Sequence, residues 1–122
     1  VGKVIPELDG RLAGAAVRVP TANVSMIDLA FQPEMKTTAE DLNAAMKAAV
    51  QGPMKGIICY SENALVSSDL NHDPHSATYA SLLTKSMDGD LVKVIAWYDN
   101  EWGFANRMID VARVMGQKVD LT

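Results

Sequence analysis

Short apolar stretches separated by polar turns dominate this chain and predict more strands than helices. Alternate residues from Val24 to Phe31 form a strongly apolar set, and this period of two indicates a strand with one well-buried face. Residues 91–98 are apolar almost throughout, so we expect a central strand there, entered through an Asp88-Gly89 hairpin turn. Further strands are expected at residues 12–19, 56–60, 66–70 and 77–83.

Two other stretches have helical periodicity. Thr37 and Glu40 have the spacing of a capping box, and the apolar stripe that follows reaches about Val50 before Gly52-Pro53 ends it. A final helix, ending near Gly116, has an apolar side made of Phe104, Met108, Val111, Ala112 and Met115.

These elements predict an α+β fold, in which a mixed or antiparallel sheet has helices packed on one face. The 122 residues suit one modest domain, residues 1–122. The opening at Val1 lacks an initiator Met and reads as the middle of a helix, so we expect the chain to be part of a longer protein. Opposite the helices, the sheet should present a face suited to another subunit.

Composition narrows the classes of partner. The formal net charge is −4 and no basic cluster stands out, so no nucleic-acid partner is expected, because phosphate-backbone binding needs concentrated Lys and Arg. No apolar run is long enough to span a bilayer and no signal-like leader is present, although a missing N-terminus would conceal one. The single cysteine excludes an internal disulfide and suits a reducing, cytoplasmic compartment.

Arg18 is the only charged residue in its expected strand and points to the face opposite its two neighbours. A surface ion pair is the ordinary role of such an arginine. An anion clamp is the alternative, because the guanidinium offers a planar donor fork that suits phosphate. Thr21 and Asn23 follow shortly and add hydroxyl and amide donors. The residues alone leave both roles open.

The residue types that often bind metals are not arranged to do so here. His72 and His75 flank Pro74, which prevents the regular helix that would bring the two imidazoles together. A metal site needs three or four converging ligands, so no metal is expected. Cys59 has no neighbouring base or helix N-terminus to activate it, and we expect a buried structural role.

The most informative stretch is 96–108, where a buried strand passes through a polar turn directly into a helix. Asp99 or Asn100 can cap that helix. Polar groups at the carboxyl end of a strand are also a common ligand position, and Tyr98 with Trp102 could wall a planar ligand. No dinucleotide-binding or phosphate loop, serine-nucleophile elbow or zinc-protease motif occurs.

Four segments in the same order resemble the phosphorylating glyceraldehyde-3-phosphate dehydrogenase family: Arg11–Ser25, Lys55–Ile58, Val66–Asp69 and Trp97–Gly103. The resemblance covers essentially the whole chain and implies the C-terminal part of the family's catalytic domain. It also implies that the Rossmann domain, the catalytic cysteine and its partner histidine precede Val1, so no catalytic residue is expected within this chain.

The resemblance implies roles for three residues. Arg18 would contact a phosphate of the substrate or the attacking inorganic phosphate. Asn100 would hydrogen-bond the nicotinamide carboxamide of NAD, and Tyr98 would line the active site. Family members usually carry tyrosine where Phe104 stands, so no hydroxyl role is transferred there. The complete enzyme would be a cytoplasmic homotetramer of glycolysis that oxidises glyceraldehyde 3-phosphate with inorganic phosphate to 1,3-bisphosphoglycerate, and the chain alone would be inactive.

Two alternatives stay open at this point. Residues 71–77 and 100–108 also resemble erythrose-4-phosphate dehydrogenase, a close relative, and both NAD and NADP remain candidates. A different class of function is a non-catalytic assembly module, which packs against other subunits or against a complementing N-terminal half.

Overall fold

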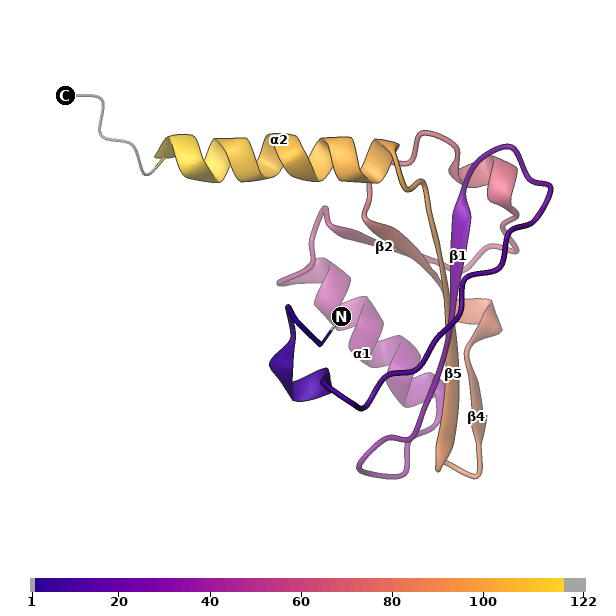
Figure 1. Cartoon of the computed structure of the whole chain (residues 1–122). Coiled ribbons are helices and arrows are strands. Elements are labelled where there is room, and N and C mark those ends of the chain that lie inside the picture. The colour runs from indigo at the N-terminus through magenta and orange to yellow at the C-terminus, as the bar shows by residue number, and fades with distance from the viewer. Residues whose placement is uncertain (1, 118–122) are drawn as a thin grey trace.

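The computed structural model describes residues 2–117 of the chain. Within them, five strands form one sheet, accompanied by two helices and three short 3-10 helices (Figure 1). In chain order the elements are η1 Pro6–Leu8, β1 Ser25–Phe31, α1 Ala39–Gln51, β2 Ile58–Ser61, η2 Ser67–Leu70, β3 Ala77–Ala80, η3 Ser81–Leu83, β4 Lys85–Met87, β5 Leu91–Tyr98 and α2 Trp102–Gln117.

Strand β5 is the centre of the sheet, as its continuous apolar sequence predicts. It pairs antiparallel with β1, β3 and β4, while β2 runs parallel to β3 at the far edge. The Asp88-Gly89 turn joins β4 to β5 with positive φ at both residues, which is the geometry of a tight hairpin. Ser25 lies opposite Tyr98, so β1 begins where β5 ends. This mixed sheet with two helices confirms the predicted α+β class.

Helix α1 is joined to the sheet by a buried polar network. It packs beside β2, and the Asn43 side-chain oxygen accepts hydrogen bonds from the Tyr79 hydroxyl at 3.0 Å and the Thr84 hydroxyl at 2.9 Å. Tyr79 and Thr84 are buried, and a fully satisfied buried network favours one packing arrangement over its alternatives. Val92 of β5 and Leu70 of η2 add apolar contacts to this small core.

The start of α1 lies one residue later than the sequence predicted. Thr38 is the N-cap: its hydroxyl accepts from the Asp41 N–H, and Asp41 accepts in return from the Thr38 N–H. Thr37 is held elsewhere, because its N–H donates to Gly89 and its carbonyl accepts from the Ser86 hydroxyl. The β4–β5 hairpin therefore holds Thr37 outside the helix, and the predicted Thr37–Glu40 capping box is wrong.

Two predicted strands do not form. Residues 12–19 are exposed and pair with no strand among the described residues, and small side chains such as Ala13 and Gly14 bring little apolar area to a sheet. Residues 66–70 contain the 3-10 helix η2, because the Asp69 carboxylate accepts from the Val66 N–H at 2.9 Å and closes a turn. Similarly, the stretch 77–83 is extended only to Ala80 and then turns as η3.

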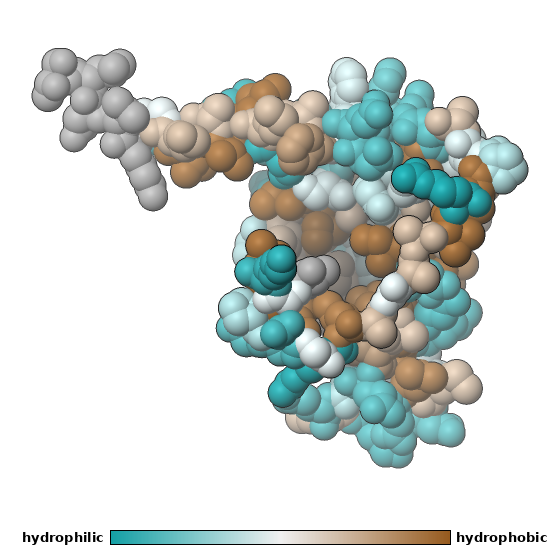
Figure 2. Space-filling model, in the orientation of Figure 1, coloured by the Kyte–Doolittle hydropathy of each residue, from teal (hydrophilic) through white to brown (hydrophobic). Residues whose placement is uncertain are grey.

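Apolar side chains remain exposed in two places. Helix α2 extends away from the sheet (Figure 1), so it covers the sheet only near its first turn, and apolar residues line its projecting length (Figure 2). On β1, the alternate apolar residues that were predicted to be well buried remain partly exposed: Ile27 is 47% exposed and Leu29 is 38% exposed. No helix among the described residues is long and apolar enough to cross a membrane.

Candidate functional site at the end of strand β5

A single buried carboxylate organises the polar turn between β5 and α2. Asp99 is 2% exposed. One of its oxygens, Oδ1, accepts from the Glu101 N–H at 3.2 Å and from the Trp102 N–H at 2.9 Å, which caps the start of α2. Asp99, not Asn100, therefore serves as the cap, which resolves one alternative that the sequence left open.

The other oxygen, Oδ2, reaches two distant segments. It accepts from the Asn23 side-chain amide at 2.9 Å and from the His72 N–H at 2.9 Å. The Asn23 amide also donates to the Asn71 side-chain oxygen at 2.7 Å. The carboxylate thus joins the segment before β1, the loop after η2 and the start of α2. We call Asp99, together with its hydrogen-bond partners Asn23, His72, Glu101 and Trp102, the Asp99 junction.

These hydrogen bonds determine the ionisation of Asp99. The Trp102 N–H has the largest effect and holds the pKa of the carboxyl below its ordinary value, whereas burial acts in the opposite direction. The donors of His72 and Asn23 lower the pKa further. The junction is therefore built around an ionised carboxylate at neutral pH, with two donors on each oxygen.

The backbone at the junction is strained at two residues. His72 has φ 61° and Val24 has φ 71°, a left-handed conformation that is costly for a residue other than glycine, above all for a β-branched one. The His72 imidazole stacks on the Trp102 indole with ring centroids 4.4 Å apart. A Cβ on Gly103 would lie 2.7 Å from the His75 carbonyl oxygen, so only glycine allows α2 to begin this close to the loop.

Asn100, which the resemblance predicts to bind the nicotinamide, and Tyr98, which it predicts to line the active site, lie on either side of Asp99. Asn100 is exposed in the turn, and none of the described residues hydrogen-bonds its carboxamide. Tyr98 ends β5 and is half-buried opposite Ser25. Phe104 is 65% exposed on the first turn of α2.

Arg18 lies in the exposed, extended segment that leads to the Asp99 junction. No carboxylate of residues 2–117 is within 4.0 Å of its guanidinium, so the surface ion pair is not formed with any described residue. The structure ties Asn23, five residues later, to Asp99 but does not itself bind Arg18 to the junction. Arg18 itself is exposed.

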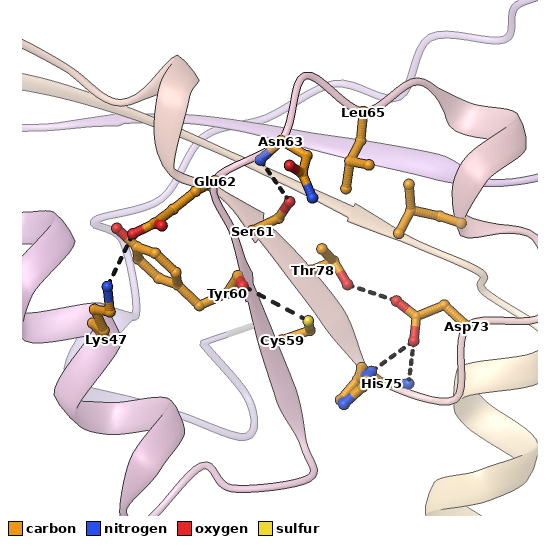
Figure 3. A pocket seen from close by; sticks show the side chains of 11 residues that line it. Lys47, Cys59, Tyr60, Ser61, Glu62, Asn63, Leu65, Asp73, His75 and Thr78 are labelled. Carbon is orange, nitrogen blue, oxygen red and sulfur yellow. Dashed lines mark hydrogen bonds and ion pairs between the residues drawn. The ribbon is translucent and has the colours of Figure 1, made fainter.

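The two histidines have structural surroundings that differ from one another. His75 lies with Nδ1 2.6 Å from Asp73 Oδ1, and Thr78 donates to the other Asp73 oxygen at 2.6 Å (Figure 3). Burial raises the pKa of Asp73, but the hydrogen bonds from Thr78 and His75 outweigh it, so the net shift is downward. These residues line an open groove of about 560 Å³ together with half-buried Cys59.

No set of three or more His, Cys, Asp or Glu side chains that could hold a metal ion occurs within the part of the chain that the structure describes. Cys59 is half-buried on β2, and its thiol makes one weak contact, 3.9 Å to the Tyr60 carbonyl oxygen.

Sequence reasoning named Asp99 only as a possible cap and did not foresee the junction. The local signal is present, because an Asp three residues before Trp102 has N-cap spacing. The long-range bond to Asn23 depends on pairing of β1 with β5, and the bond to His72 lies next to the pairing of β3 with β5; a single sequence shows neither pairing.

Comparison with known proteins identifies close relatives. A family model described as "Glyceraldehyde 3-phosphate dehydrogenase, C-terminal domain" matches residues 1–100. The chain is 53% identical over 117 residues to the glyceraldehyde-3-phosphate dehydrogenase of Cereibacter sphaeroides, which is 96% of the chain and 35% of that protein. It is 59% identical over 112 residues to the chromosomal glyceraldehyde-3-phosphate dehydrogenase of Cupriavidus necator, 92% of the chain and 33% of that protein.

A Bacillus subtilis protein, "Glyceraldehyde-3-phosphate dehydrogenase 1", is 50% identical over 118 residues, 97% of the chain and 35% of that protein. The chain therefore spans about a third of the length of the curated relatives it matches.

Proposed function

Because this chain belongs to the glyceraldehyde-3-phosphate dehydrogenase family, we propose that it is the C-terminal part of an enzyme that oxidises glyceraldehyde 3-phosphate with inorganic phosphate to 1,3-bisphosphoglycerate. The observation that carries this proposal is the identity of 50–59% over almost the whole chain to proteins of that name. NAD is the proposed cofactor, the cytoplasm the proposed location and glycolysis the proposed pathway.

Arg18 is the proposed phosphate contact. Its guanidinium is exposed and has no carboxylate partner among the described residues, so its donor fork is available for the phosphate of the aldehyde or for inorganic phosphate. An arginine also keeps its charge at every physiological pH, which suits a site that must bind a dianion.

Asn100 is the proposed contact for the nicotinamide carboxamide. Its side chain offers one acceptor and two donors, which complement a second carboxamide. It is exposed at the carboxyl end of β5, and the Asp99 junction holds the turn that carries it. Tyr98 is proposed to line the same site. When bound, NAD supplies the hydride acceptor, while this chain's residues orient the ring and the phosphate.

The chain alone is proposed to be inactive, because the resemblance places the nucleophile and the dinucleotide-binding domain outside it. A pure sample of residues 1–122 should produce no NADH from glyceraldehyde 3-phosphate, phosphate and NAD. Turnover by the chain, once contamination by a complete enzyme is excluded by intact-mass analysis, would contradict this part of the proposal.

The complete enzyme is proposed to assemble as a homotetramer. The chain exposes 9387 Å², whereas a compact monomer of this length would expose about 6,400 Å². The apolar residues of α2 and of β1 provide surface for another subunit or for the rest of the same chain. An assembly module without catalytic function is the second candidate, and a chain of residues 1–122 that is stable on its own would favour it.

The decisive experiment compares variants of the full-length enzyme that contains this chain. Arg18→Ala should lower phosphate-dependent efficiency roughly 10- to 150-fold, since a charge-assisted hydrogen bond is worth about 1.5–3 kcal/mol. Arg11→Ala removes the same charge from the same exposed segment and should have little effect. Asn100→Ala should instead weaken NAD binding and the hydride step.

The two defects should separate when a non-phosphorylated aldehyde is the substrate, because only the Arg18→Ala loss should shrink. If the folded Arg18→Ala enzyme kept the normal dependence on phosphorylated substrate and on inorganic phosphate, the phosphate role would be wrong. Erythrose 4-phosphate, assayed beside glyceraldehyde 3-phosphate, tests the alternative substrate, and NADP beside NAD tests the cofactor.

A further inference from the structure

We propose that Asp99 and Asn23 are positioning residues that fix the Arg18 segment and the Asn100 turn relative to each other, so that phosphate binding and NAD binding are coupled through the Asp99 junction. This inference rests on the proposed function of Arg18 and Asn100. Neither Asp99 nor Asn23 is required to touch substrate or cofactor.

The two oxygens of the Asp99 carboxylate accept hydrogen bonds from different segments. Oδ1 accepts from the N–H groups of Glu101 and Trp102, which fixes the turn that carries Asn100. Oδ2 accepts from the Asn23 amide, which fixes the end of the segment that carries Arg18. Because one rigid group serves both sides, a displacement on one side moves the acceptor on which the other side depends.

Burial makes this connection stronger than a surface contact would be. Asp99 is 2% exposed, so water cannot replace a lost donor without opening the junction. Hydrogen bonds to a charged acceptor in such surroundings are about twice as strong as neutral ones. Capping α2 requires only Oδ1 of Asp99. The two long-range donors on Oδ2 therefore indicate a second role, which is to hold distant segments together.

The strained backbone supports the same conclusion. Val24 directly follows Asn23, and His72 supplies the other donor to Oδ2, and both have positive φ. Such residues persist only where the surrounding structure over-determines them, and they gather at functional sites. The hydrogen bonds of Asn23 and His72 to Asp99 thus hold the strained backbone of Val24 and His72 in place.

Asn23→Ala in the full-length enzyme is the first test, because it removes one donor on Oδ2 and leaves the α2 cap on Oδ1 intact. The KM for inorganic phosphate and the Kd for NAD should both rise, each by about 2- to 12-fold, the range that one hydrogen bond supplies. Asn43→Ala is the matched control: it also breaks a buried polar network, but one that lies between α1, Tyr79 and Thr84. It should lower the unfolding midpoint and leave both constants unchanged.

A double-mutant cycle separates positioning from general loosening of the fold. If Asn23 acts on NAD through the Asn100 turn, Asn23→Ala should add nothing to the Kd for NAD in an Asn100→Ala enzyme. If it acts on phosphate through the Arg18 segment, it should add nothing to the KM for phosphate in an Arg18→Ala enzyme. Asn23→Asp, which replaces the donor by a second carboxylate, should be worse than Asn23→Ala on both constants.

The outcomes distinguish this inference from the proposed function. If Arg18→Ala and Asn100→Ala have their expected effects while folded Asn23→Ala changes only the phosphate constant, or neither constant, the coupling is refuted and the function stands. Additive behaviour in both cycles would also refute it. If Arg18→Ala and Asn100→Ala have no effect, the function itself fails, whatever Asn23→Ala does.

Discussion

Two carboxylates, Asp73 and Asp99, each gather several hydrogen bonds, yet they do different things for the fold. All the partners of Asp73 lie within five residues of it, at His75 and Thr78, so it shapes a local turn. Asp99 bonds to Asn23, 76 positions away, and to His72, 27 positions away. The comparison indicates that similar polar groups serve local folding in one place and assembly of distant segments in another.

Of the two carboxylates, Asp99 should cause the larger loss in the free energy of unfolding when it is replaced. Asp99→Ala removes four hydrogen bonds and leaves the part-buried N–H groups of His72 and Trp102 without this acceptor, so the free energy of unfolding should fall by about 3–4 kcal/mol. Urea unfolding of the variant and of the unchanged protein measures the loss. A fall below about 1 kcal/mol would show that water takes the place of the carboxylate and that the junction is not tightly closed.

Replacement of Asp73 should have a smaller effect, about 1–2 kcal/mol, because its side chain is 16% exposed and its partners His75 and Thr78 remain near one another in the chain. Asp73→Ala and Asp99→Ala combined should give additive losses, since the two carboxylates share no donor. The same urea titrations measure this. A strongly non-additive pair would instead mean that the loop from Asn71 to His75 transmits one change to the other.

Acid should weaken both clusters over the same pH range. The folded-state pKa of each carboxyl lies below its ordinary value, so the stability that each supplies is complete above about pH 4 and is lost as pH falls through the lower folded-state pKa. The free energy of unfolding, measured in urea between pH 7 and pH 2, should fall toward low pH. In Asp73→Asn that fall should be shallower than in the unchanged protein, and an equal slope would contradict the role of Asp73.

Removal of the α1 cap should cause the smallest loss of stability, because the cap lies at an exposed position and its partners are local. Thr38→Ala should cost about 1 kcal/mol, the usual loss for an N-cap hydroxyl. Thr37→Ala is the control: its hydroxyl bonds only to the Met35 carbonyl and does not cap the helix. Thermal unfolding of the two variants should rank Thr38→Ala below Thr37→Ala, and the reverse order would restore the capping box predicted from sequence.

The sequence predicted those elements whose stability is local or whose burial is continuous. The period of two over β1, the apolar run of β5 and the Asp88-Gly89 turn were sufficient for three neighbouring parts of the sheet. Residues 12–19 failed because strand propensity needs a partner strand, and the described residues provide none. Residues 66–70 failed because the Asp69 side chain competes for the backbone of Val66.

The candidate site was predictable only in part. A cap at Asp99 or Asn100 follows from spacing alone, and the structure shows which of the two it is. The roles of Arg18, Asn100 and Tyr98 come from the family resemblance and stay predictions. The contact between Asn23 and Asp99 has no sequence signal, because it depends on the antiparallel register that brings Ser25 opposite Tyr98.

That register has a consequence for the order in which the chain folds. The β4–β5 hairpin closes over a few residues, whereas pairing of β1 with β5 must enclose all of residues 32–90 and therefore carries a larger loop-closure entropy. We expect the hairpin to form early and β1 to dock late. The Trp102 N–H, which is fixed by a carboxylate that β1 docking helps to bury, should become protected in pulse-labelling hydrogen exchange after the amides of β5 that face β4. Simultaneous protection of the two sets would mean that the chain closes its longest loop first.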